Sequence, residues 1–116
     1  MAKVNFRINY QVLQKRKFEQ YLDKYGKSLA VPLHDLRISR YPKIPEQFQA
    51  SFWVELTAGS VEGAVYQMLI WANGLRSSGW SIIGPQADNN LAFECIYSDN
   101  ESDNPLKWAH LEFEDE

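Results

Sequence analysis

A strict alternation of apolar and polar side chains runs through residues 48–56. The apolar members share one side of an extended chain, and they are Phe48, Ala50, Phe52, Val54 and Leu56. This period of two predicts a strand with one side in a core. Trp53 falls among the polar residues, on the side away from that core. The chain therefore needs a sheet with one buried face, and Trp53 belongs to the other face.

The same reasoning predicts the other elements. Alternation predicts strands at residues 4–10 and 36–38, and shorter runs predict strands at 80–83, 91–97 and 106–113. Helical spacing predicts a first helix over residues 11–25, with Gly26 where it stops, and a second helix that begins after Ser60 as N-cap. The core stripe expected for the second helix is Val61, Ala64, Val65, Met68, Leu69, Ala72 and Leu75. Ile70 and Trp71 widen its apolar arc, which indicates burial on more than one side or a contact surface.

The elements read β-α-β-β-α-β-β-β along the chain, which places the protein in the α+β class. The first six follow the ferredoxin-like succession, in which two helices cover one face of an antiparallel sheet. Its other face is left to solvent, a partner or a second subunit. We expect the last two strands to extend the sheet as a hairpin, and residues 1–116 to form a single domain.

The only cysteine, Cys95, lies on the apolar side of a strand-like alternation with Phe93 and Tyr97, so we expect a buried thiol in a reducing compartment. The first ten residues alternate where a signal peptide would show a continuous apolar run, and the longest apolar stretch is too short for a bilayer. These features predict a cytoplasmic protein without membrane contact.

Few residues suggest catalysis. His34 and His110 belong to no spaced metal-ligand motif, and the glycines form no phosphate loop. The sequence therefore predicts no catalytic residue, no metal, no cofactor and no enzyme activity. One alternative stays open, in which His34 and His110 meet in space as an acid and base pair.

Charge is unevenly distributed along the chain. The net charge is −3, yet residues 1–47 hold ten Lys and Arg against four Asp and Glu, whereas residues 88–116 hold nine Asp and Glu against Lys107 alone. A basic run at residues 15–17 suits a solvated helix face, and a pI near 5.4 disfavours nucleic acid as the main ligand. The acidic third, in which Tyr97, Trp108 and Phe113 are interleaved, favours binding of a basic protein. A frayed solubilising tail at residues 112–116 is the alternative.

In size, element order and the acidic, aromatic stretch over residues 91–116, the chain resembles the immunity proteins that neutralise bacterial contact-dependent or polymorphic toxins. The resemblance implies an inhibitor that covers a basic toxin, commonly a nuclease. The contact residues expected from charge are Asp99, Glu101, Asp103, Trp108 and Glu112. The alternative function is a ferredoxin-like homodimer that binds a small ligand, with Trp53 in the interface or pocket.

Overall fold

The computed structural model describes residues 2–84, 93–99 and 103–115. Its elements, in chain order, are β1 (Ala2–Gln11), α1 (Lys15–Leu29), β2 (His34–Arg40), β3 (Gln47–Glu55), α2 (Val61–Leu75), β4 (Trp80–Ile83), β5 (Glu94–Ser98) and β6 (Leu106–Asp115). The α+β class and the expected element order are confirmed. The strand at residues 80–83 agrees with the expectation, and β6 begins at Leu106 as expected and continues two residues further. β5 begins at Glu94 and ends one residue later than expected, and residues 91 and 92 of the expected strand lie outside the described residues.

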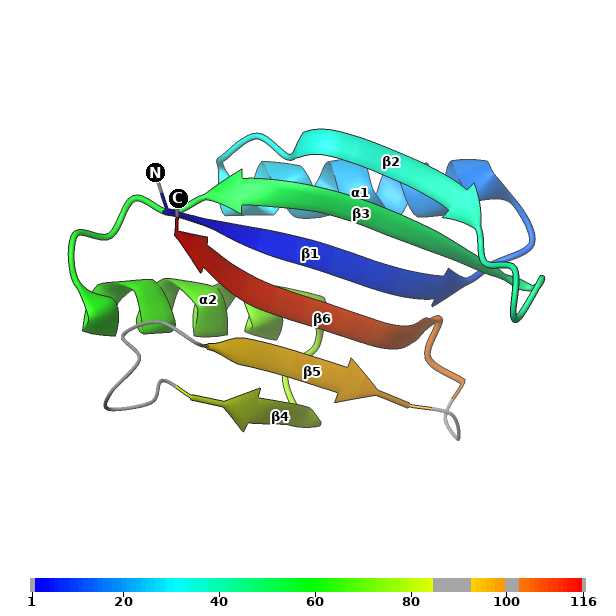
Figure 1. Cartoon of the computed structure of the whole chain (residues 1–116). Helices are drawn as coiled ribbons and strands as arrows, with labels where there is room; N and C mark the ends of the chain where they lie inside the picture. Colours follow the sequence, from blue (N-terminus) through cyan, green and yellow to red (C-terminus); the bar gives the residue numbers. More distant parts are fainter. Residues whose placement is uncertain (1, 85–92, 100–102, 116) are drawn as a thin grey trace.

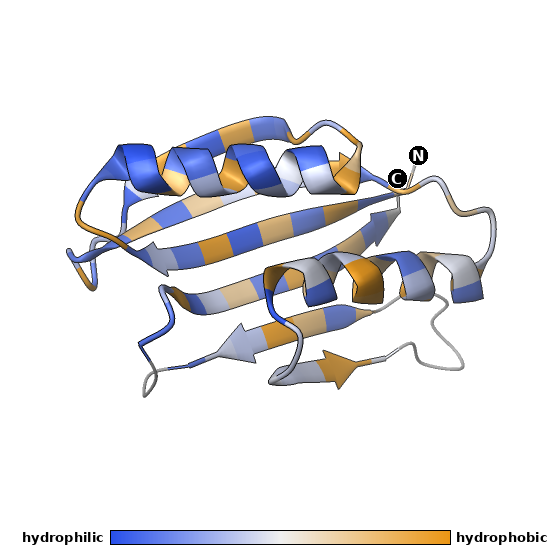
Figure 2. Cartoon of the chain, turned by 180° about the vertical axis from the view of Figure 1, so that it is seen from behind, coloured by the Kyte–Doolittle hydropathy of each residue, from blue (hydrophilic) through white to orange (hydrophobic). Residues whose placement is uncertain are grey.

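The six strands form one sheet in the order β2-β3-β1-β6-β5-β4, and every neighbouring pair is antiparallel. Both helices lie on the same face of this sheet, as the two opposite views show (Figure 1 and Figure 2). Figure 2 also shows the hydrophobic and hydrophilic residues alternating along the strands. Neither α1 nor α2 covers the opposite face of the sheet.

β6 lies inside the sheet, between β1 and β5, and it takes the place beside β1 that the ferredoxin-like succession gives to the strand after the second helix. The last two strands do pair with each other, as expected of a hairpin, but the edge position goes to β4. Burial explains the exchange, because β6 buries Leu106, Ala109, Leu111 and Phe113, whereas Ile82 and Ile83 of the four-residue β4 stay about half exposed.

The expected bounds of α1 were wrong at both ends. Residues 11–14 do not belong to the helix, because β1 continues to Gln11, which pairs with Gln47 and donates its N–H to the carbonyl of Pro105. Gly26 lies inside the helix, which ends three residues later at Leu29, and the C-cap residue Ala30 adopts a left-handed φ of 59°. Strand pairing of Gln11 therefore delays the start of the helix, and the left-handed Ala30, not Gly26, ends it.

The side of α2 that enters the core differs from the expected stripe. Ser60 is the N-cap as expected, and its hydroxyl accepts the N–H of Gly63. The buried residues are Ala64, Met68, Trp71, Ala72 and Leu75. Val61 and Leu69 belong to the expected stripe but are exposed, whereas Trp71, which lies outside that stripe, is buried. The exposed residues of α2 include the large side chains of Tyr66 and Ile70.

One core cluster fills the space between the helices and the sheet. Phe6 lies at its centre, stacked on Phe52 with ring centroids 4.7 Å apart and edge-on to Tyr25. The Tyr25 hydroxyl donates a hydrogen bond to the carbonyl of Trp71 at 2.6 Å, which ties α1 to α2. Cys95 is fully buried in this cluster, as the sequence predicted.

Candidate functional site

The face of the sheet without helices carries the polar set of each strand alternation, and we call it the uncovered face. Strand register places the following residues on it: Asn5, Arg7 and Asn9 on β1, Ser51 and Trp53 on β3, Trp108, His110 and Glu112 on β6, and Glu94 and Ile96 on β5. Trp53 therefore lies on the side predicted for it. The face holds both signs of charge and two tryptophans, a composition typical of a recognition surface.

Trp53 is fixed by contacts within the chain. Its indole N–H donates to Oδ2 of Asp35 at 2.8 Å, and its ring stacks on His34 with centroids 4.1 Å apart. Nζ of Lys3 lies 5.0 Å from the indole centroid, within the range of a cation–π contact. Asp35 adopts a left-handed φ of 55° in the irregular stretch of β2 beside this contact. Trp53 thus presents a rigid, half-buried surface.

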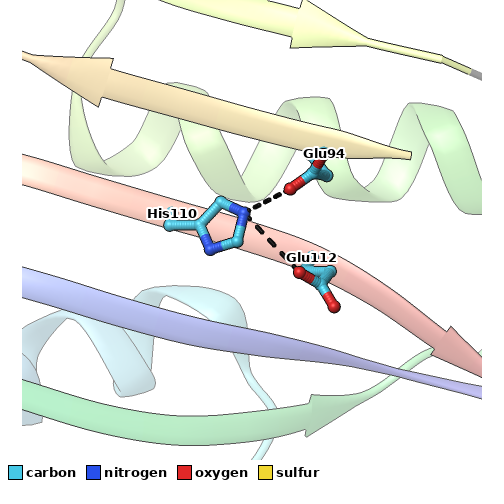
Figure 3. A group of neighbouring side chains, drawn as sticks. All are labelled: Glu94, His110 and Glu112. Carbon is cyan, nitrogen blue, oxygen red and sulfur yellow. Dashed lines mark hydrogen bonds and ion pairs between the residues drawn. The ribbon is translucent and has the colours of Figure 1, made fainter. Parts of the chain in front are cut away.

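Glu94, His110 and Glu112 form a cluster at one end of the uncovered face (Figure 3). Nε2 of His110 lies 2.7 Å from Oε1 of Glu94 and 3.8 Å from Oε2 of Glu112. Glu94 and Glu112 are directly opposite in the β5–β6 register, and His110 is two residues from Glu112 on the same side of β6. The imidazole is largely buried, with 13 % of its side chain exposed, whereas Glu112 is half exposed.

Glu114 continues the row of carboxylates along β6. Its Oε2 accepts a hydrogen bond from Nδ2 of Asn5 at 3.2 Å and lies 3.2 Å from Nζ of Lys3. The hydrogen bond from Asn5 and then that from Lys3 lower the pKa of Glu114 below its ordinary value, so the carboxylate form is favoured. This end of the uncovered face therefore holds three acidic residues in fixed positions.

Two polar hollows lie on the uncovered face and share Arg7. The first, about 350 Å³, includes Asn5, Arg37, Trp53 and His110 in its walls, and the second, about 310 Å³, is bounded by residues that include Asn9, Gln49 and Trp108. Asn9 is buried, and its Oδ1 has no hydrogen-bond partner in the part of the chain that the structure describes. An acceptor left in this state favours a donor from outside the chain.

A larger hollow of about 610 Å³ lies away from this face, between α1 and β2. Its walls are mainly apolar and include Leu22, Val31, Leu33, Leu36 and Ile38. Leu36 is exposed there, at the edge strand of the sheet. Glu19, Asp23 and Lys27 of α1 also line this hollow, and Nζ of Lys27 forms an ion pair with Oδ2 of Asp23 at 3.0 Å.

The expected contact residues are divided between two places. Trp108 and Glu112 both lie on the uncovered face, but four residues of β6 separate them by roughly 13 Å. Asp99 lies beyond Ser98 and accepts a hydrogen bond from the buried Tyr97 hydroxyl at 3.0 Å, on the helix side. Asp103 is exposed near the start of β6. Glu101 lies outside the described residues, and the others do not form one contiguous acidic patch.

The two histidines are held apart in the sheet, and the single cysteine is buried. His34 on β2 and His110 on β6 share the uncovered face, but β3 and β1 lie between their strands, a separation of roughly 14 Å. They therefore do not meet as an acid and base pair. Burial raises the pKa of the Cys95 thiol to about 11, which disfavours the reactive thiolate.

Sequence reasoning missed the Glu94–His110–Glu112 cluster. The spacing of His110 and Glu112 by two residues, on a predicted strand, was the available signal that they share a side. Glu94 could not be added to them without the β5–β6 register. The place of Arg7 and Arg37 beside His110 likewise depends on the strand order.

No family model, no curated protein and no solved structure matches this chain. In the described residues, no helix has the length and apolar character needed to cross a membrane. The uncovered face, with its fixed carboxylates and tryptophans, is therefore the feature of the molecule that bears on function.

Proposed function

We propose that this chain is a protein-binding inhibitor of the immunity type, which neutralises a basic bacterial toxin, of which a nuclease is the commonest kind, by covering it with the uncovered face. The observation that carries the proposal is the position of Glu112 and Glu114 on β6, an interior strand paired on both sides. Acidic residues of a frayed tail would be solvated separately. On an interior strand they form, with Glu94, a fixed negative area that a basic partner can match.

Binding to a protein fits this face better than burial against a second identical sheet. Face-to-face packing of two copies would enclose Arg7, Arg37, Glu94 and Glu112 of each copy, and buried charge is costly unless every group is paired. The basic groups of a toxin surface can pair with Glu94 and Glu112, and acidic groups between them can pair with Arg7 and Arg37. Trp108 and Trp53 supply aromatic area between the charged residues, and such side chains are common anchors of interfaces.

The proposal assigns a binding role and no catalytic one. The separation of His34 from His110 and the burial of Cys95 support this assignment. A cytoplasmic location is part of the proposal, and the buried reduced thiol is consistent with it.

The test is capture of a partner from a lysate of the source cells, in buffer with chelator, at low and at high salt. The expected partner is a basic protein that is toxic when expressed alone, whose retention falls as salt rises. Co-expression of the wild-type chain should restore growth. The double variant Glu112→Lys, Glu114→Lys should lose both capture and rescue.

A matched control separates local from overall charge effects. Glu19→Lys reverses one negative charge, as each substitution of the double variant does. Glu19 lies on the exposed side of α1, which covers the opposite face of the sheet. The Glu19→Lys variant should capture the partner and restore growth as the wild type does. Equal loss in both variants, or a complex that high salt leaves intact, would count against the proposal.

A second candidate is a homodimer, and the outward side of α2 favours it. Tyr66 is 67 % exposed and Ile70 49 %, with Leu69 beside them. Exposed apolar patches on a helix commonly mark protein contacts. Sedimentation of the wild type and of Ile70→Lys tests this candidate. A dimeric wild type and a monomeric variant would support a homodimer, and a monomeric wild type would exclude it.

A further inference from the structure

The cluster of Glu94, His110 and Glu112 combines three metal-ligating side chains on a rigid part of the fold. One ligand atom from each residue lies within 4.8 Å of the other two (Figure 3). The residues come from adjacent strands, and the backbone beneath them is anchored by Cys95 and Leu111, both fully buried. Sites on packed strands hold their ligands more precisely than sites on loops.

The cluster contains two carboxylates and one imidazole, so a bound cation would balance its negative charge. Glu94 and Glu112 are directly opposite each other, an arrangement of like charges that destabilises an antiparallel pair. Among the described residues, neither carboxylate has a lysine or arginine within ion-pairing distance, and His110 is their shared partner. Arg7 lies opposite His110 in the β1–β6 register but forms no ion pair with either carboxylate.

We propose that this cluster is a binding site for a divalent transition-metal ion of the Zn²⁺ type. Nε2 of His110 and one carboxylate oxygen from each of Glu94 and Glu112 would be the protein ligands. Bonds of about 2.0–2.2 Å place the ligand atoms of a tetrahedral zinc site roughly 3.3–3.6 Å apart. The 2.7 Å contact between His110 and Glu94 opens slightly, and the 3.8 Å contact to the half-exposed Glu112 closes slightly.

The histidine decides which ions fit. An imidazole nitrogen suits Zn²⁺, Cu²⁺ and Ni²⁺, whereas Mg²⁺ and Ca²⁺ prefer sites made of oxygen alone. On binding, Nε2 gives its lone pair to the ion and the ring proton resides on Nδ1. Three protein ligands leave the fourth position of the ion to water or to a ligand from outside the chain.

The experiment titrates ZnCl₂ into chelator-treated wild-type protein by calorimetry, with the histidine ring signals followed by NMR. One ion should bind per chain, and the ring signals of His110 should shift while those of His34 stay in place. His110→Gln should weaken binding by at least about tenfold, since even changes behind the ligands cost that much in metal sites. Glu94→Gln, which keeps the shape of the side chain, should weaken it as well.

His34→Gln is the matched control, because His34 lies on the same face but stacks on Trp53 away from the cluster. It should bind Zn²⁺ as the wild type does, and circular dichroism should show that every variant is folded. Equal affinity in the wild type and His110→Gln, displacement of Zn²⁺ by equimolar Mg²⁺, or no binding by the wild type would overturn the proposal. The titration involves no protein partner and partner capture is done with chelator, so either proposal can fail alone.

Discussion

Nε2 of His110 lies 2.7 Å from Oε1 of Glu94, and this contact joins two residues sixteen positions apart in the chain. It crosses from β6 to β5 on the uncovered face and brings Glu112 into the same group. The cluster of Glu94, His110 and Glu112 is therefore assembled by the register between β5 and β6. No local motif in the sequence contains all three residues.

Removal of the Tyr25 hydroxyl should destabilise the fold. Tyr25→Phe deletes the buried hydrogen bond to the carbonyl of Trp71, and a bond of this kind contributes about 1 kcal/mol. Urea denaturation should show a loss of that size in the free energy of unfolding. Tyr66→Phe is the control, because Tyr66 is exposed, and its effect should stay within about 0.5 kcal/mol. Similar effects in both variants would contradict the assigned link between the helices.

The orientation of α2 can be tested with neighbouring residues. Met68 is fully buried and Leu69 is exposed, although both belong to the stripe expected from the sequence. Met68→Ala should cost about 2–5 kcal/mol of unfolding free energy, as buried truncations do, and Leu69→Ala should cost less than about 1 kcal/mol. Thermal and urea unfolding measure both. Similar losses for the two variants would mean that the helix is turned as the sequence indicates, with both residues in the core.

The environment of Cys95 predicts a decline of stability at alkaline pH. Desolvation raises the pKa of the thiol from 9.0 to about 11 on folding, so the unfolded chain ionises first as the pH rises. The stabilising difference is complete below pH 9.0 and is lost progressively between pH 9.0 and about 11. Wild-type stability should fall more steeply over that interval than that of Cys95→Ala, as urea midpoints at several pH values will measure.

The same burial controls the reactivity of the thiol. In native buffer a thiol reagent such as DTNB should leave Cys95 unmodified, and modification should begin only when urea unfolds the chain. Rapid reaction of the native protein would place the thiol at the surface and contradict this prediction.

Glu114 predicts a stability difference that disappears in acid. Hydrogen bonds from Asn5 and Lys3 lower the pKa of Glu114 on folding, so its contribution is present above the ordinary pKa of 4.5 and is lost as the pH falls below it. Glu114→Gln should therefore be less stable than the wild type at pH 7 and equal to it in strong acid. The control is Glu46→Gln, in the exposed turn between β2 and β3, whose stability at pH 7 should stay within about 0.5 kcal/mol of the wild type, as for most exposed substitutions.

The alternations at residues 4–10 and 48–56 were sufficient to predict which side of β1 and β3 enters the core, and they placed Trp53 on the uncovered face. Alternation is a local property of an extended chain, so it can be read without knowing the neighbours of a strand. The Ser60 cap and the burial of Cys95 were predictable for the same reason.

The position of β6 in the sheet could not be predicted from the residues of that strand alone. β4 and β6 both read as strands, and which of them lies beside β1 depends on the total apolar area that each buries in the assembled sheet. That choice fixes the acidic residues on an interior strand. It also places Glu112 opposite Glu94, with His110 between β1 and β5.

The sequence by itself thus determined the α+β class, the element order, the buried side of the central strands and the excess of acid near the C-terminus. The tertiary structure alone decided the strand order, the turn of α2 and the meeting of Glu94, His110 and Glu112. The physical reason is that periodicity reports the environment of one segment. Pairing and register are settled by competition among segments far apart in the chain for the same buried surface.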